Sequence, residues 1–214
     1  MRKQILMGSA LFLALTFQPF STTAAQTGAT PTLIDARSDS APYARDLGNR
    51  DPRVRQQAAE ALARLTAVDQ KMVIEGYYLQ EKNKNVRLAL EWALYRIGRS
   101  ASLFKIVREL DSGRQQQAIG YLAQLDSPAQ LYPFLDQERT RPRILEGLLE
   151  ALGRFGDAES LERIKPFLTR FEPGVAAAAE IATEKIERRL AQAEGETPGP
   201  SRPRTIGKVE QTTP

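Results

Sequence analysis

The sequence has neither cysteine nor histidine among its 214 residues. Without cysteine there is no disulfide, no thiol nucleophile and no zinc–thiolate site. Without histidine the chain lacks the commonest general base and the commonest metal ligand. Carboxylate chemistry remains open, but no acidic constellation stands out, and neither GxGxxG nor GxxxxGK occurs. We therefore expect no enzymatic activity, no catalytic residues, no metal site and no cofactor.

Long apolar runs are also scarce. The run Ile5–Phe17 has 13 residues, well short of the roughly 20 that a membrane-spanning helix needs. It follows a short basic start at residues 1–4 and precedes small residues at 21–25. This layout is typical of a secretory signal peptide cleaved after Ala25, and it predicts export to the bacterial periplasm or the cell exterior. An uncleaved membrane anchor is the alternative, and the shortness of the run argues against it.

Basic residues slightly outnumber acidic ones. The chain has 30 basic and 26 acidic residues, a net charge of +4. Arg2 and Lys3 leave with the predicted signal peptide, which contains no acidic residue, so the mature chain keeps a net charge of +2. So small an excess argues against a nucleic-acid partner, because such proteins concentrate basic residues to neutralise phosphates.

What the sequence does contain is an internal repeat. Five stretches align on the pattern Asp51-Pro52-x-Val54, and their starts are separated by 32, 28, 30 and 31 residues. They are DPRVRQQAAEALARL from Asp51, NKNVRLALEWALYRI from Asn83, DSGRQQQAIGYLAQL from Asp111, RPRILEGLLEALGRF from Arg141 and EPGVAAAAEIATEKI from Glu172. Apolar residues recur in them at helical spacing, which predicts amphipathic helices. We call these five segments the aligned helices.

A second helical segment precedes or follows each aligned helix. We expect these intervening helices at residues 41–47, 66–79, 100–110, 127–135 and 157–168. Ser127 and Asp157 are good helix caps, and Gly98 lies where a helix should stop. Pro133 and Pro166 fall late in two of the segments, where a proline should kink the helix. No stretch alternates like a strand, so the unit is a helix–turn–helix of about 30 residues.

The fragments DPRVRQQAAEALARL and EALGRFGDAESLERIKPFL resemble HEAT-like repeats, in particular the short kind first noted in phycobilisome bilin lyases. The resemblance covers about residues 41–190. It implies an all-α fold, a right-handed α-solenoid of about five helix–turn–helix repeats. Residues 26–40 are polar, and residues 191–214 are rich in proline, glycine and charge, so we expect both segments to be disordered.

Two groups of cationic residues are candidates for binding a partner. Arg55 and Arg87 each follow an aligned valine, where HEAT-like repeats often place an arginine that bonds to an aspartate of a neighbouring turn. Such a ladder is the structural alternative to a basic patch. A column at the ends of the aligned helices comprises Arg64, Arg96, Gln124, Arg154 and Lys185. Cations there suit the negative end of the helix dipole, but the column could also attract an anionic partner.

Trp92, the only tryptophan, aligns with Glu60, Gly120, Glu150 and Ile181. Three of these four do not look like core positions, which predicts a partly exposed position for Trp92. It could anchor a partner or pack across Gly120 of the next repeat. Glu60, Glu91 and Glu150 are expected on outer helix faces, where they would favour solubility.

These observations favour a non-enzymatic scaffold in the bacterial envelope, which binds a protein or peptide on the concave face of the solenoid. One alternative is the binding of a polyanion, either nucleic acid or an acidic polymer, through the arginine columns. Another is a bilin-lyase-like enzyme or chaperone subunit, which the resemblance alone implies. The identity of the partner and the oligomeric state stay open at this point.

Overall fold

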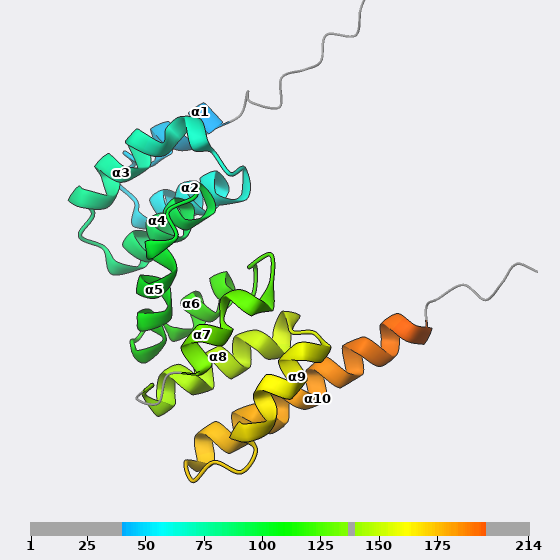
Figure 1. The fold of residues 1–214 in the computed structure, drawn as a ribbon. Coiled ribbons are helices and arrows are strands. Elements are labelled where there is room, and N and C mark those ends of the chain that lie inside the picture. The colour runs from blue at the N-terminus through cyan, green and yellow to red at the C-terminus, as the bar shows by residue number, and fades with distance from the viewer. Residues whose placement is uncertain (1–39, 137–139, 196–214) are drawn as a thin grey trace, which may run out of the picture. The chain divides into compact units, whose positions relative to one another are not determined.

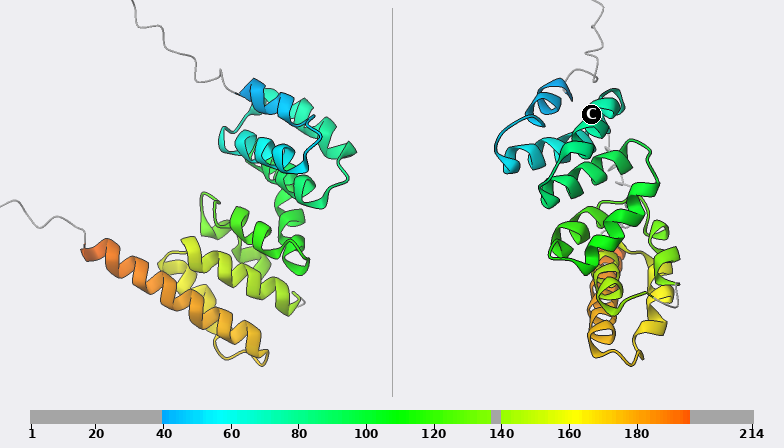
Figure 2. Two further views of the ribbon diagram at one scale, coloured as in Figure 1. Left: turned by 180° about the vertical axis from the view of Figure 1, so that it is seen from behind. Right: turned by 90° about the vertical axis from the view of Figure 1, so that its left-hand side faces the viewer.

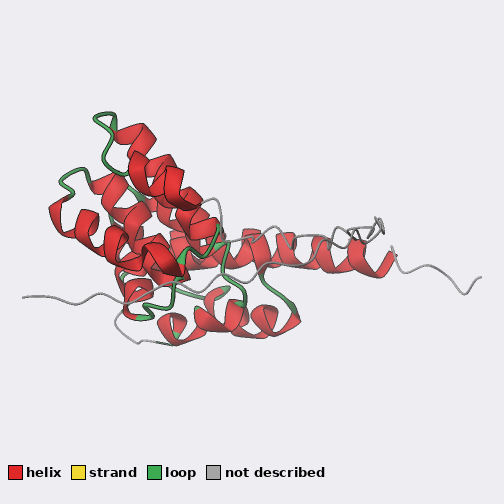
Figure 3. Ribbon diagram, turned by 90° about the horizontal axis from the view of Figure 1, so that it is seen from above, coloured by secondary structure: helices red, strands yellow, loops and turns green. Residues whose placement is uncertain are grey.

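The computed structural model describes residues 40–136 and 140–195, and every regular element in these ranges is helical (Figures 1 and 3). The predicted all-α class is therefore confirmed. The predicted signal peptide lies outside the described residues, as do residues 26–39 and 196–214. The helical region runs from Ser40 to Gly195, slightly beyond the expected range of 41–190 at both ends. Within it, no helix combines the length and the apolar character needed to cross a membrane.

Each of the five aligned stretches forms a helix. They are α2 (Pro52–Arg64), α4 (Lys84–Arg96), α6 (Gln115–Leu122), α8 (Pro142–Phe155) and α10 (Pro173–Gly195). Their starts follow the expected capping rules. The Asp51 side chain accepts a hydrogen bond from the backbone N–H of Arg53 at 2.8 Å, and Asn83 accepts from the N–H groups of Asn85 and Val86 at 3.0 and 3.3 Å.

The intervening segments are helical as well, but most consist of two short pieces. They are α1 (Ser40–Asp46), η1 (Val68–Gln70) with α3 (Lys71–Gln80), α5 (Ala101–Arg108) with η2 (Glu109–Asp111), η3 (Pro128–Gln130) with α7 (Tyr132–Leu135), and α9 (Ala158–Ile164) with η4 (Lys165–Phe167). The expected kinks at Pro133 and Pro166 are wrong. Each proline instead lies in the first turn of a new short helix, where its missing N–H costs no hydrogen bond.

The aligned helices pack against one another in chain order, and their apolar stripes form the core. Helix α2 lies along α4, α6 lies against α8, and α8 lies along α10 (Figure 2). Leu62, Leu94, Leu122 and Leu152 occupy the same position of successive repeats, and all four are completely buried. Burial of such a leucine contributes about 1.5–3 kcal/mol, so this column supplies a substantial part of the stability.

The contact between α4 and α6 departs from this regularity. These two helices touch far less than α2 and α4 do, and α6 has eight residues where α2 and α4 have 13. The third stretch has Gly113 near its start and lacks the proline or lysine that begins its neighbours. Consequently Ser112 is extended, and the helix begins only at Gln115. The late start leaves a hollow between α3, α4 and α5.

Candidate functional site

Arg55 is held in a structural ion pair. Its Nε and Nη2 donate to the two carboxylate oxygens of Glu81 at 2.8 and 3.0 Å, and its Nη1 donates to the carbonyls of Asn49 and Arg50 at 2.9 and 3.0 Å. The hydrogen bond from Arg55 holds the pKa of Glu81 below its usual range, although burial of that carboxyl opposes the shift. Arg55 thus bonds to the next repeat, as a ladder residue should, but through Glu81 and not through an aspartate.

The cationic column is partly used in similar local contacts. Arg96 donates to Asp126 at 3.1 Å and lies over the Trp92 ring, 5.6 Å from its centroid. Arg154 pairs with Glu150 one turn earlier on α8 at 2.8 Å. Arg64 is exposed and makes no ion pair with any residue that the structure describes. Two cations of the column, Arg96 and Arg154, are therefore paired with acidic side chains.

Trp92 is only 3 % exposed, so the expectation of a partly exposed position is wrong. Its ring stacks on Tyr95 of the same helix and on Tyr121 of α6, each with ring centroids 5.6 Å apart. The Tyr121 hydroxyl donates to Glu60 of α2 at 2.7 Å, across α4. Burial raises the pKa of Tyr121 far above its usual range, so this hydroxyl stays a donor. The expectation that Glu60 is merely a surface residue is therefore also wrong.

Glu91 is 4 % exposed, which contradicts its expected place on an outer face. Lys105 of α5 donates to its Oε1 at 2.7 Å and also to the Tyr78 hydroxyl at 3.0 Å. Burial would raise the pKa of Glu91, but Lys105 and the hydroxyls of Ser102 and Tyr78 outweigh it and lower that pKa. The Ser102 Oγ and the Glu91 Oε2 are both buried without a well-formed hydrogen bond to any described residue.

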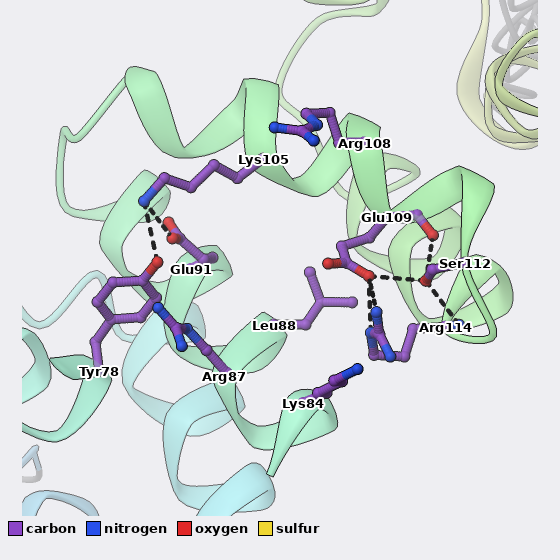
Figure 4. A pocket seen from close by; sticks show the side chains of 10 residues that line it. All are labelled: Tyr78, Lys84, Arg87, Leu88, Glu91, Lys105, Arg108, Glu109, Ser112 and Arg114. Atoms are coloured by element: carbon purple, nitrogen blue, oxygen red, sulfur yellow. Dashed lines mark hydrogen bonds and ion pairs between the residues drawn. The ribbon is translucent and has the colours of Figure 1, made fainter. Parts of the chain in front are cut away.

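Glu91 lies at the edge of a pocket of about 420 Å³ between α3, α4, α5 and the start of α6 (Figure 4). We call it the cationic pocket. Its lining residues are Tyr78, Lys84, Arg87, Leu88, Glu91, Lys105, Arg108, Glu109, Ser112 and Arg114. Five of these are basic and two are acidic. A hollow of this size can receive one or two side chains of a partner, or a small ligand.

Both acidic residues of the pocket are already neutralised from within. Glu91 pairs with Lys105, and Glu109 pairs with Arg114, whose Nε donates to its carboxylate at 2.7 Å. The other three cations, Lys84, Arg87 and Arg108, form no ion pair with the part of the chain that the structure describes. The Arg87 guanidinium lies 4.9 Å from the centroid of the Tyr78 ring. This cation–π contact holds the Arg87 side chain at the pocket wall.

The arrangement suits an anionic group. Three cations that form no ion pair with any described residue line a partly enclosed space, beside the buried side chains of Tyr78 and Leu88 (Figure 4). No three acidic side chains gather to hold a metal ion within residues 40–136 and 140–195.

Sequence reasoning singled out Arg87 but missed the rest of the pocket. Glu91 carried a usable signal, because the same position of the first, third and fourth repeats holds Ala59, Ile119 and Leu149, all completely buried, although the fifth repeat holds the exposed Glu180. A carboxylate in an apolar column predicts a buried ion pair.

In comparisons with known proteins, no family model matches the chain, and no curated protein matches it with significance.

Proposed function

We propose that this protein is an exported, non-enzymatic scaffold, a HEAT-like α-solenoid of five helix pairs, which binds an acidic segment of a partner protein in the cationic pocket. The observation that carries the proposal is the set Lys84, Arg87 and Arg108, three cations around one hollow that form no ion pair within residues 40–136 and 140–195. Cations that serve only solubility are dispersed over a surface or paired with nearby acids, as Arg188 is with Glu184.

The packing of the aligned helices supports the solenoid. Helix α2 packs extensively against α4, and α8 against α10, so these repeats bury their apolar stripes against each other, whereas α4 and α6 touch little. A solenoid also offers a reason for the pocket, because a local change in one repeat opens a gap without disturbing distant ones. The proposed site is lined by the aligned helix α4, which carries Lys84 and Arg87, and by the intervening helices α3 and α5.

A protein segment fits the site better than a long polyanion does. A polyanion needs a continuous run of cations along its path. Here Arg96 and Arg154 of the column are bound to acidic side chains, and the three available cations surround a single hollow. One or two carboxylates of an acidic peptide would satisfy these three cations.

Titration with a glutamate hexapeptide, blocked at both ends, tests the proposal by calorimetry. The double variant Lys84→Gln/Arg108→Gln should weaken binding by about tenfold or more, because charge-assisted hydrogen bonds contribute about 1.5–3 kcal/mol in protected sites and less in open ones. The control, Arg154→Gln/Arg188→Gln, removes two exposed cations from α8 and α10 and so makes the same change in net charge.

Equal weakening in the control pair would show that only net charge matters, and would contradict the proposal. Heparin provides the second arm. If heparin binds with steep salt dependence while the hexapeptide does not bind, the protein is a polyanion binder and the proposed acidic-segment site is wrong.

A further inference from the structure

Arg55 and Arg87 occupy the same place in successive repeats, and so do Glu81 and Glu109. Each arginine is four residues into an aligned stretch, and each glutamate is two residues before the next stretch begins, at Asn83 or Asp111. At the first of these junctions the two side chains form a two-pronged ion pair, with N···O distances of 2.8 and 3.0 Å. At this position of the repeat, the arginine can therefore bind both oxygens of a carboxylate.

At the second junction the glutamate is bonded elsewhere. The Glu109 Oε2 accepts from Arg114 Nε at 2.7 Å, from Arg114 Nη2, and from the Ser112 hydroxyl at 2.7 Å. Arg87 instead lies over the Tyr78 ring (Figure 4). The equivalent arginine and glutamate thus line the same pocket without pairing.

Arg114 is the residue that departs from the repeat. The same position of the other four repeats holds Val54, Val86, Ile144 and Val175. Val86 and Val175 are buried in the core, at 1 % and 0 % exposed. An arginine in an apolar column gives up burial in the core, so it calls for a gain elsewhere. In the structure, Arg114 instead forms an ion pair with Glu109.

We propose that Arg114 is a positioning residue: it holds Glu109 away from Arg87, so that Arg87 binds a carboxylate of the partner's acidic segment as Arg55 binds Glu81. This inference rests on the proposed function of the pocket. Arginine suits the task because its planar fork matches the two oxygens of a carboxylate, whereas Lys84 can offer only a point charge.

The first test needs no ligand. A crystal structure of Arg114→Gln should place the Glu109 carboxylate within 4 Å of the Arg87 guanidinium, the distance that defines an ion pair. A Glu109 side chain that stays away from Arg87 in this variant would overturn the positioning role. The helical circular dichroism of the variant checks that the fold is intact.

The second test is binding of the blocked glutamate hexapeptide. Arg114→Gln should weaken it by about tenfold, because Glu109 then competes for Arg87. Arg114→Gln/Glu109→Gln should recover affinity to within about threefold of the original. The control is Arg114→Gln/Asp111→Asn, which has the same net charge as the Glu109 double variant. Asp111 is a neighbouring carboxylate that pairs with Arg141 at 2.5 Å, and the control should still bind the hexapeptide weakly.

The outcomes separate the two proposals. Recovery in the Asp111 control as well would reduce the effect to net charge and overturn the inference. No recovery in the Glu109 double variant would mean that Arg114 itself contacts the peptide, which also overturns it. If the original protein does not bind the hexapeptide, the proposed function fails, even where the crystal structure of Arg114→Gln displays the new Arg87–Glu109 pair.

Discussion

Replacing Lys105 with methionine should leave a buried carboxylate without its counter-ion. Glu91 has a side chain 5 % exposed, and Lys105 is its only ion-pair partner within the described ranges. Breaking a buried ion pair by removing one partner costs about 3–5 kcal/mol. The Lys105 side chain is 43 % exposed, so water screens the pair, and we expect a smaller loss of about 2 kcal/mol in the free energy of unfolding at pH 7.

The loss should depend on pH, and its sign follows from the pKa of Glu91. With Lys105 in place the folded-state pKa is lowered, so the carboxylate contributes stability above its unfolded pKa of about 4.3. That contribution is lost as the pH falls through the lower, folded-state value. In Lys105→Met the burial of Glu91 dominates and raises its folded-state pKa above about 4.3. The variant is then penalised increasingly as the pH rises through this raised value.

Urea unfolding, followed by circular dichroism at pH 7 and pH 4.5, measures both effects. The difference between the variant and the original protein should be largest at pH 7 and clearly smaller at pH 4.5. The control is Lys165→Met, which removes a cation from an exposed pair with Glu162 and should change stability by less than about 0.5 kcal/mol. A loss for Lys105→Met that is equally small, or the same at both pH values, would refute the reasoning.

Three further predictions concern the fold and the export of the chain. Trp92→Ala should lower the free energy of unfolding by about 3–5 kcal/mol, measured by urea unfolding, because the ring is buried in a stack with Tyr121. A loss below about 1 kcal/mol would contradict the burial of Trp92. Glu81→Gln should cost about 1–3 kcal/mol in the same assay, because it removes the charged partner of Arg55, and an unchanged stability would contradict the structural role of that pair. Mass spectrometry of the exported protein should find Gln26 at the N-terminus, and a retained Met1 would contradict the predicted signal peptide.

The sequence was sufficient to locate the helices, because their signals are local. The caps at Asp51, Asn83 and Asp157 depend on residues within three positions, and the apolar stripes depend on spacing within one helix. The prolines were misinterpreted for the same reason. The residues around Pro133 are compatible both with a kink inside one long helix and with the first turn of a new helix. Which of the two forms depends on how the short helix α7 packs against the rest of the protein.

The pocket could be predicted only in part, because it depends on contacts across repeats. Arg87 stood out beside Arg55, but the two have different partners, and nothing local to either arginine reveals this. The irregular positions were visible in principle: Glu91 and Arg114 each place a charge in a column that is otherwise mostly apolar. That both charges line one hollow follows from the late start of α6, which brings α5 and the segment before α6 around the first half of α4.

The central claim is that an acidic protein segment binds in the cationic pocket, and a crystal structure of the protein with the blocked glutamate hexapeptide tests it most directly. We predict peptide carboxylates within 4 Å of Arg87 and of Lys84 or Arg108, with the Glu109–Arg114 pair intact. A peptide that lies instead along the aligned helices beside Arg64, with the pocket unchanged, would contradict the account.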